Sequence, residues 1–285
     1  MDPFLPSRDQ TSTTTEPASQ RRYTLTDTMA PPLLLGISGP SSSGKTTLSR
    51  LLRDIFPPKQ LTIVHLDDFY LTDAEIPVKN GIQDWDCLES LDLKGLREAL
   101  KFIRKEGRSP DWLVSKEDQN SVGEHSVSER VVVELKREME ALLSEHPDWK
   151  ERRICIVDGF LLFSDEMKDI RELFDVRLFL RTSYETAKKR REARSGYVTL
   201  EGFWEDPPGY VDNIVWPNYV KDHKFLFEDE DVDGDLDEDV LAKTGIYGMP
   251  REAEGDMEVC LRWSVGVLKD VIKGRDGEKD VDMDD

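Results

Sequence analysis

The stretch that decides the fold of this chain is Gly39-Pro40-Ser41-Ser42-Ser43-Gly44-Lys45-Thr46, which directly follows an apolar run at residues 33–37. It matches the pattern G-x-x-x-x-G-K-[ST], a loop whose backbone N–H groups cradle phosphates. The glycines let the backbone curl so that consecutive N–H groups point at one anion, and the positive N-terminal end of the following helix adds to the attraction. Lys45 supplies a mobile cation for the β and γ phosphates, and the Thr46 hydroxyl is a ligand for Mg²⁺.

The sequence on both sides of the loop supports the same interpretation. Residues 33–38 are typical of a buried strand, and Pro57-Pro58 ends the helix that follows the loop. That helix has apolar residues at the spacing of one face: Leu48, Leu51, Leu52 and Ile55. The alternative is a Ser/Gly-rich turn between two ordinary elements, but strand, loop and helix follow in the required order. We therefore predict a nucleoside triphosphate site on Gly39, Pro40, Ser41, Ser42, Ser43, Gly44, Lys45, Thr46 and Thr47.

Strands and helices alternate along the rest of the chain. Apolar runs predict further strands at residues 61–65, 154–157 and 176–180, and the last two read as buried on both faces. Spacing and composition predict helices at about residues 90–104, 131–143, 184–194 and 257–272. This alternation indicates an α/β fold with a doubly wound, mostly parallel sheet and the nucleotide at the carboxyl edge of its strands.

The formal net charge of the 285 residues is −20, and the excess of carboxylates is local. Residues 228–239 contain nine carboxylates and no basic residue, and residues 276–285 contain six against Lys279. Such runs indicate solvated loops and tails. They argue against nucleic-acid binding, which needs clustered positive charge.

The N-terminal residues 1–28 are polar and charged, so they predict neither a signal peptide nor a membrane anchor. Asp2, Asp9 and Glu16 argue against a mitochondrial presequence, and no run reaches transmembrane length. The three cysteines are far apart and odd in number, which is typical of free thiols in a reducing compartment. We expect a cytoplasmic protein, with a nuclear location also open, and no membrane partner.

Carboxylates follow two of the predicted strands, at the edge where sites of doubly wound folds form. Asp67 follows the strand at residues 61–65, and a carboxylate beside Mg²⁺ can orient an attacking hydroxyl and accept its proton. Asp68 either shares this role or caps the turn. Asp158 is either a ligand of Mg²⁺ or of its water, or a turn residue. The predicted metal ligands are Thr46, Asp67 and Asp158.

Several further motifs occur between residue 33 and about residue 227 in a fixed order. After the phosphate loop come Asp67-Asp68-Phe69-Tyr70, Lys79-Asn80-Gly81, Trp85-Asp86, Asp158-Gly159-Phe160-Leu161-Leu162-Phe163, Lys188-Lys189-Arg190-Arg191-x-x-Arg194, and Pro208-Gly209-Tyr210 with Trp216-Pro217. Each motif beyond the loop is weak alone, but the set is specific. It resembles the nicotinamide riboside kinases, a family of P-loop nucleoside kinases close to the uridine kinases.

The resemblance implies a helical lid and a nucleoside pocket. In such kinases the aromatic–acid pair after the Asn-Gly turn holds the nucleoside, so Trp85 would stack on a pyridinium ring and Asp86 would accept bonds from ribose hydroxyls. On pattern alone, this pair also reads as a core tryptophan beside a surface aspartate. The other substrate contacts that the resemblance implies are Asp67, Asp68, Phe69, Tyr70, Arg191 and Tyr197.

The basic helix falls in the lid of similar kinases, where arginines clamp the transferring phosphoryl group. By resemblance, Arg190 and Arg194 face ATP and Arg191 reaches the substrate side, and Arg190 joins Lys45 and Asp67 as a catalytic group. A basic run on a helix is otherwise a solvated face.

Three segments depart from the family pattern: the N-terminal extension, a polar insert and an acidic insert. We expect a disordered extension at residues 1–30, one kinase domain at 31–273 and a disordered acidic tail at 274–285. Within the domain, a polar insert lies at about residues 105–147 and an acidic insert at 228–239.

The sequence thus predicts a monomeric, Mg²⁺-dependent kinase that transfers phosphate from ATP to the 5′-hydroxyl of nicotinamide riboside. A uridine or cytidine kinase is the nearest alternative, but a neutral pyrimidine needs hydrogen-bond partners at its edge, and Trp85 offers mainly a face. A non-catalytic nucleotide-binding switch is an alternative of another class. The chain has no Asn-Lys-x-Asp guanine motif, because Lys79-Asn80-Gly81 is not one.

Overall fold

A parallel sheet forms the centre of this computed structural model, which describes residues 30–115, 125–194, 196–199 and 202–274. Within those residues the sheet has five strands in the order β2-β5-β1-β6-β9, and every pairing is parallel. The strands are β1 (Leu33–Ser38), β2 (Leu61–His65), β5 (Ile154–Gly159), β6 (Val176–Phe179) and β9 (Tyr247–Gly248). The predicted doubly wound α/β fold is confirmed, and β9 is the strand that the sequence patterns did not reveal.

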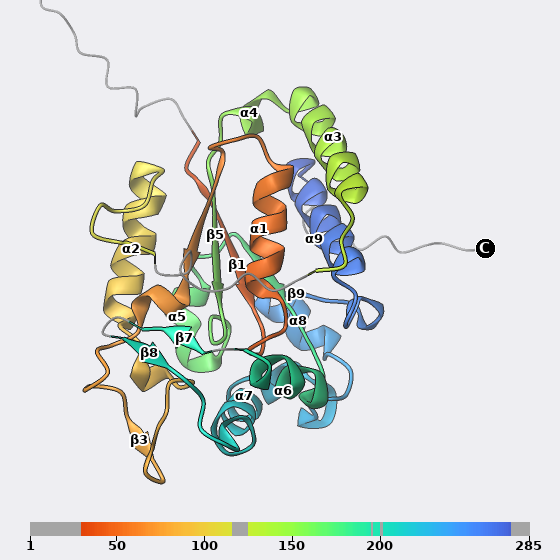
Figure 1. Cartoon of the computed structure of the whole chain (residues 1–285). Helices are drawn as coiled ribbons and strands as arrows, with labels where there is room; N and C mark the ends of the chain where they lie inside the picture. Colours follow the sequence, from red (N-terminus) through yellow and green to blue (C-terminus); the bar gives the residue numbers. More distant parts are fainter. Residues whose placement is uncertain (1–29, 116–124, 195, 200–201, 275–285) are drawn as a thin grey trace, which may run out of the picture.

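Helices cover both faces of the sheet, which explains why its strands are apolar without alternation. Leu35 and Ile37 of β1 pack into one cluster, while Leu34 packs into the cluster on the opposite face. On the first face lie α1 (Lys45–Ile55), α3 (Glu129–Glu145) and α9 (Met257–Ile272), side by side in Figure 1. On the second lie α2 (Leu93–Glu106), α5 (Lys168–Arg171), α7 (Trp216–His223) and α8 (Glu238–Thr244).

Smaller elements complete the described chain. The short helix α4 (Pro147–Lys150) leads into β5, and α6 (Tyr184–Glu192) is the basic helix, two residues shorter than predicted. Two hairpins lie outside the main sheet: β3 (Val78–Lys79) with β4 (Ile82–Gln83), and β7 (Tyr197–Val198) with β8 (Phe203–Trp204). No helix in the described ranges is long and apolar enough to cross a membrane.

Part of the segment predicted as a polar insert belongs to the core. Its helix α3 buries Val131, Leu135 and Met139 in the cluster that contains α1 and α9. The polar residues of α3 face outward, so the amphipathic pattern of this helix reflects ordinary core packing. Residues 116–124 of the insert lie outside the described residues, as do 1–29 and 275–285 at the predicted disordered ends.

The predicted acidic insert is folded against the rest of the molecule. Phe227 and Leu236 form a bridge across it, and both side chains are buried. Arg181 donates to the Gly234 carbonyl at 2.6 Å and Arg251 donates to Asp235 at 2.9 Å. These contacts tie the carboxylate-rich turn to the ends of β6 and β9, although its charge pattern alone indicated a solvated loop.

The strand order gathers three chain segments at one edge of the sheet. β5 lies between β2 and β1, so the carboxyl ends of these strands are neighbours. The residues that follow β2, the last residues of β5 and the loop after β1 therefore converge. This is the edge at which ligands bind in doubly wound folds.

Candidate active site

The loop between β1 and α1 has the backbone of an anion cradle. Gly39 and Gly44 have φ angles of 143° and 101°, which favour glycine, and a Cβ on Gly39 would lie 2.2 Å from the Leu180 carbonyl oxygen. Gly44 is the N-cap of α1. The first N–H groups of α1, which have no partner within the helix, therefore face the loop that would enclose a phosphate.

Lys45 lies half-buried at the start of α1. Its Nζ donates to the carbonyl oxygens of Gly39 and Pro40 at 3.0 and 2.8 Å, so the ammonium folds back over the loop. Burial lowers the pKa of Lys45 to about 8, although Asp158 and Asp67 act in the opposite direction. An anion in the loop would restore the charged form.

Asp158, near the end of β5, is buried and held in place by two side chains. His65 Nδ1 lies 2.7 Å from one carboxylate oxygen, and Ser49 Oγ donates to the other at 3.1 Å. His65 and Asp158 are direct partners in the β2–β5 register, which explains their contact. The orientation of Asp158 is therefore set by β2 and α1 as well as by its own strand.

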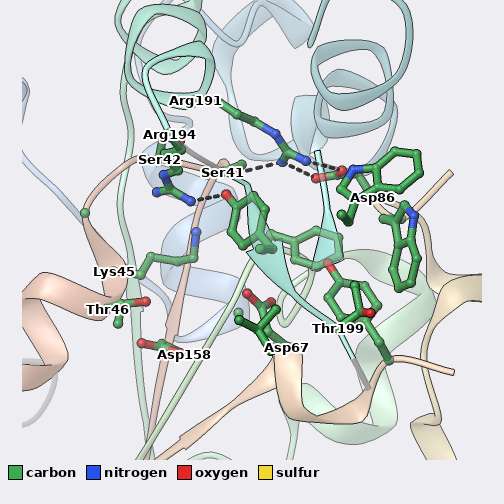
Figure 2. Close-up of a pocket in the computed structure, with 18 of the residues that line it drawn as sticks. Ser41, Ser42, Lys45, Thr46, Asp67, Asp86, Asp158, Arg191, Arg194 and Thr199 are labelled. Carbon is green, nitrogen blue, oxygen red and sulfur yellow. Dashed lines mark hydrogen bonds and ion pairs between the residues drawn. The ribbon is translucent and has the colours of Figure 1, made fainter. Parts of the chain in front are cut away.

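The phosphate loop, Asp67 and Asp158 open into one pocket of about 900 Å³, its open mouth included. In Figure 2, Lys45, Thr46 and Asp158 gather at one side of this pocket and Asp67 lies at its floor. Asp86 and Arg191 stand on the opposite side. Among the described residues, the lining consists of Ser41, Ser42, Gly44, Lys45, Thr46, Thr47, Asp67, Tyr70, Trp85, Asp86, Asp158, Gly159, Phe160, Arg191, Arg194, Tyr197, Val198, Thr199 and Trp204.

Aromatic rings form the wall away from the phosphate loop. Trp85 meets Tyr70 edge to face at 5.3 Å between ring centroids, and Trp204 of β8 lies 5.7 Å from Trp85. Tyr70 also stacks on Phe160 at 6.3 Å. The wall suits a flat aromatic group, because ring faces and edges pack against such a group, and a ring face also attracts a cationic one.

Asp86 and Arg191 form a bidentate ion pair that joins the nucleoside side of the pocket to α6. Arg191 is 6% exposed and donates to both Asp86 oxygens, at 2.8 and 2.9 Å, and to Ser41 Oγ at 2.9 Å. Asp206 accepts from Arg191 Nε at 2.6 Å on another side of the guanidinium. Burial alone would lower the pKa of Arg191, but Asp86 and Asp206 keep it raised, so the guanidinium is charged.

The other lid arginines are exposed. Arg194 lines the pocket and donates to the Tyr197 hydroxyl, and its guanidinium lies 5.2 Å from the Tyr197 ring centroid. Arg190 does not line the pocket, but its Nη1 donates to the Ser42 carbonyl of the phosphate loop at 3.2 Å. Both guanidiniums thus lie on the side where a triphosphate would end.

Thr46, Asp67 and Asp158 fit a magnesium site of the kind that nucleotides complete. They line one pocket beside Lys45, and oxygen is the ligand atom that Mg²⁺ prefers. In the described part of the chain, no three His, Cys, Asp or Glu side chains gather into a metal cage. Mg²⁺ is usually held by one or two carboxylates together with phosphate oxygens, so this pattern agrees with a nucleotide-borne ion.

Some predicted site residues lie outside the pocket lining. Phe69, predicted to contact the substrate, does not line the pocket: its side chain is buried in the core on the α2 side and meets Trp112 edge to face at 6.5 Å. Asp68 also does not line the pocket. Pro40 lines a smaller neighbouring cavity, and Gly39 and Ser43 contribute backbone to the loop.

Sequence reasoning missed several pocket and supporting residues. Trp204, Val198 and Thr199 come from the β7–β8 hairpin, and Asp206 from the segment after it. No motif marks them, since they reach the pocket only when the hairpin folds over it. The position of His65 could have been used to predict that it lies near the site, because it is the last residue of the predicted strand that precedes Asp67.

Comparison with known proteins gives the family. The chain is 47% identical to the nicotinamide riboside kinase of Schizosaccharomyces pombe over 205 residues, which cover 72% of this chain and 84% of that protein. The chain belongs to the nicotinamide riboside kinase family. The nicotinamide riboside kinase of Saccharomyces cerevisiae is 37% identical over 72% of this chain and 83% of its own length. Human nicotinamide riboside kinase 2 is 32% identical, with 66% of each chain covered.

No family model matches the chain, so its membership rests on these relatives. The resemblance read from the short motifs is thereby confirmed. In this member of the nicotinamide riboside kinase family, the phosphate loop and the Trp85–Asp86 pair belong to the same pocket.

Proposed function

We propose that this protein transfers the γ-phosphoryl group of ATP to the 5′-hydroxyl of nicotinamide riboside and so forms nicotinamide mononucleotide. The observation that carries the proposal is that one pocket is lined by the phosphate loop, by Asp67 and by the Trp85–Asp86 pair. In Figure 2, Lys45 and Thr46 of the loop lie on the side opposite Asp86, with Asp67 at the floor. The names of the relatives support the same substrate.

In the proposed reaction, the amides of residues 39–47 and the ammonium of Lys45 hold the triphosphate. Asp67 orients the 5′-hydroxyl and accepts its proton as the oxygen attacks phosphorus. Mg²⁺, held by Thr46, Asp67 and Asp158 together with phosphate oxygens, would neutralise phosphate charge. Arg190 and Arg194 stabilise the charge of the transferring group from the lid side.

The charges around the nucleoside side favour a cationic base. Asp86 lines the pocket, and Asp84 and Asp206 lie close enough to act on it electrostatically. Arg191 is the cation that faces Asp86, so carboxylates outnumber guanidinium groups near this end. A pyridinium ring would gain from this excess and from the faces of Trp85 and Trp204, whereas a neutral pyrimidine would gain less.

Two alternatives remain testable. A uridine or cytidine kinase would share the phosphate loop and Asp67, and a non-catalytic nucleotide switch would leave Trp85 and Asp86 without a purpose. We also propose that the protein acts as a monomer in the cytoplasm, in line with its charge and free thiols.

Steady-state turnover with ATP and Mg²⁺ tests the proposal, with nicotinamide riboside, uridine and cytidine compared by kcat/KM. We expect nicotinamide riboside to be preferred and the preference to collapse in Trp85→Ala. A preference for uridine would keep the kinase and replace its substrate. No turnover with any riboside would favour the nucleotide switch.

A further inference from the structure

The segment that carries Trp85 and Asp86 has no secondary structure of its own. It lies between the β3–β4 hairpin and a short 3₁₀ helix at residues 88–90. Side chains fix the Trp85 backbone instead: its N–H donates to the Tyr210 hydroxyl at 2.9 Å, and its carbonyl accepts from Ser90 Oγ at 3.0 Å. A substrate pocket made from irregular chain needs such supports to keep its geometry.

Asn218 of α7 is a third side chain that holds the segment. This side chain is buried, with a residue exposure of 7%. Its Nδ2 lies 3.0 Å from each carboxylate oxygen of Asp84 and 3.0 Å from the Asp86 carbonyl oxygen. On its other side, Oδ1 accepts from Lys79 Nζ at 3.1 Å.

These partners leave the amide one orientation. The groups around Nδ2 are all acceptors, and Lys79 is a donor. A flipped amide would therefore place its oxygen against acceptor oxygens and its NH₂ group against the Lys79 ammonium. Neither a carboxylate nor an apolar side chain at position 218 would reproduce this pattern. A carboxylate would repel Asp84, and an apolar side chain would leave the buried Asp84 carboxylate short of donors.

Asp84 in turn holds the backbone of Asp86, the residue proposed to contact the ribose. It is 5% exposed, and one of its oxygens accepts from the Asp86 N–H at 3.1 Å. Asn218 thus contacts both ends of the Asp84–Asp86 segment, once directly at the Asp86 carbonyl and once through the Asp84 carboxylate. Loosening it would let Trp85 and Asp86 move together. The phosphate loop is coupled to this movement only indirectly, through Arg191, which donates to both Asp86 and Ser41 Oγ.

We propose that Asn218 is a positioning residue for the riboside, which it affects by holding Asp84–Asp86 in the geometry that receives the nucleoside. The inference rests on the proposed function for its substrate. It requires a selective effect: Asn218→Ala raises KM for the riboside by about tenfold, the cost of a buried hydrogen-bond partner lost at the binding segment. The KM for ATP stays within about twofold, because Asn218 makes no direct bond to the phosphate loop and reaches it only through Asp86, Arg191 and Ser41.

Asn213→Ala is the matched control. Asn213 is a nearby, exposed asparagine whose Nδ2 donates to the Gly209 carbonyl at 2.8 Å, with no bond to the Asp84–Asp86 segment. Its removal leaves both KM values unchanged. A general loss of packing would instead lower kcat and raise both KM values together, and that result for Asn218→Ala would overturn the proposal, as would an unchanged riboside KM.

An exchange of the two side chains tests the contact itself. Asn218→Asp alone sets two buried carboxylates against each other, and Asp84→Asn alone removes the charge that the amide binds. When both substitutions are combined, an amide at position 84 can donate to a carboxylate at position 218, so the double variant has a lower riboside KM than Asn218→Asp alone. Equal riboside KM values in the double variant and in Asn218→Asp would overturn the proposal. This comparison also tests the proposal if Asn218→Ala does not fold.

The measurement uses whichever riboside the wild-type enzyme phosphorylates best. Failure of the proposed substrate is then seen in the wild type, while failure of this inference is seen in the ratio of variant to wild-type KM. The two outcomes are therefore distinguishable.

Discussion

Arg191 and Asp86 form a buried bidentate ion pair, with 2.8 Å between Nη1 and Oδ1 and 2.9 Å between Nη2 and Oδ2. Both side chains are almost fully buried, at 6% and 5% exposure. The pair joins the lid helix α6 to the segment expected to hold the ribose. If Asp86 accepts bonds from the ribose as proposed, nucleoside binding is linked to the position of α6 and its arginines.

Asp86→Ala should therefore be costly for folding as well as for binding. It removes one partner of a buried pair and leaves Arg191 with Asp206 and the Ser41 hydroxyl, which costs about 3–5 kcal/mol in the free energy of unfolding. Urea denaturation measures this loss, and kcat/KM for the riboside should fall in parallel. Asp212→Asn, which breaks the exposed contact with Lys188, is the control and should cost far less. A similar loss of stability in both variants would show that the buried Asp86–Arg191 pair stabilises the fold no more than the exposed Asp212–Lys188 pair does.

Asp67→Asn should reduce kcat by about 10²–10⁴-fold, because an amide cannot accept the proton of the attacking hydroxyl. Thermal unfolding should change little, since the side chain keeps its size, and so should binding of ADP measured without Mg²⁺, for which Asp67 is a proposed ligand. The neighbouring Asp68→Asn is the control: Asp68 does not line the pocket, so its kcat should stay within a few fold of wild type. A kcat for Asp67→Asn close to that of Asp68→Asn would remove Asp67 from the mechanism.

Nucleotide binding should take up protons near pH 8. In the free protein Lys45 has a pKa of about 8, so about half of the lysines are neutral at that pH. Phosphates in the loop favour the ammonium and raise the pKa, so binding of ADP takes up roughly half a proton per site. Calorimetry in buffers of different ionisation enthalpy measures the uptake. Lys45→Arg, which stays charged, should bind with little uptake, and an equal value in both proteins would contradict the assignment to Lys45.

His223 of α7 should make the protein less stable as the pH falls from 6.5 towards 4. Its ring is buried between Phe179 and Tyr219, and burial lowers its pKa to about 4 from the usual 6.5. Between these values the unfolded chain binds the proton and the folded chain does not, so unfolding becomes easier as the pH falls. Above pH 6.5 the titration of His223 does not reduce the free energy of unfolding, and at pH 4 it reduces this free energy by about 3 kcal/mol.

Urea denaturation between pH 4 and pH 7 compares wild type with His223→Phe to isolate this effect. The variant keeps a ring between its two aromatic neighbours but cannot titrate, so its stability should decline less steeply with falling pH. Parallel curves for the two proteins would show that His223 does not contribute.

Several features could be predicted because they depend on residues that are close together in the sequence. The phosphate loop, its flanking strand and helix, and the helix at residues 257–272 depend on local spacing, and each is found where predicted. Asp67 and Asp158 could be placed together because parallel strands end at a common edge. The two-residue strand β9 escaped prediction, since it is too short to show a period.

Phe69 shows the limit of carrying a motif over as a block. Its neighbours Asp67 and Tyr70 line the pocket, yet its own side chain enters the core on the α2 side. The motif identifies the segment correctly, but the turn at residues 66–69 decides which side chains reach the pocket.

The sequence by itself determined the α/β fold, the anion-binding loop and the family, because spacing and residue type act over a few neighbouring positions. The tertiary structure alone decided the pairings that shape the pocket: Asp86 with Arg191, His65 with Asp158, and Asp84 with Asn218. These partners are 105, 93 and 134 residues apart, and no local pattern records which polar group will face which. Each of these three carboxylates has the partner that packing brings within reach, since a buried carboxylate left unpaired would cost several kcal/mol.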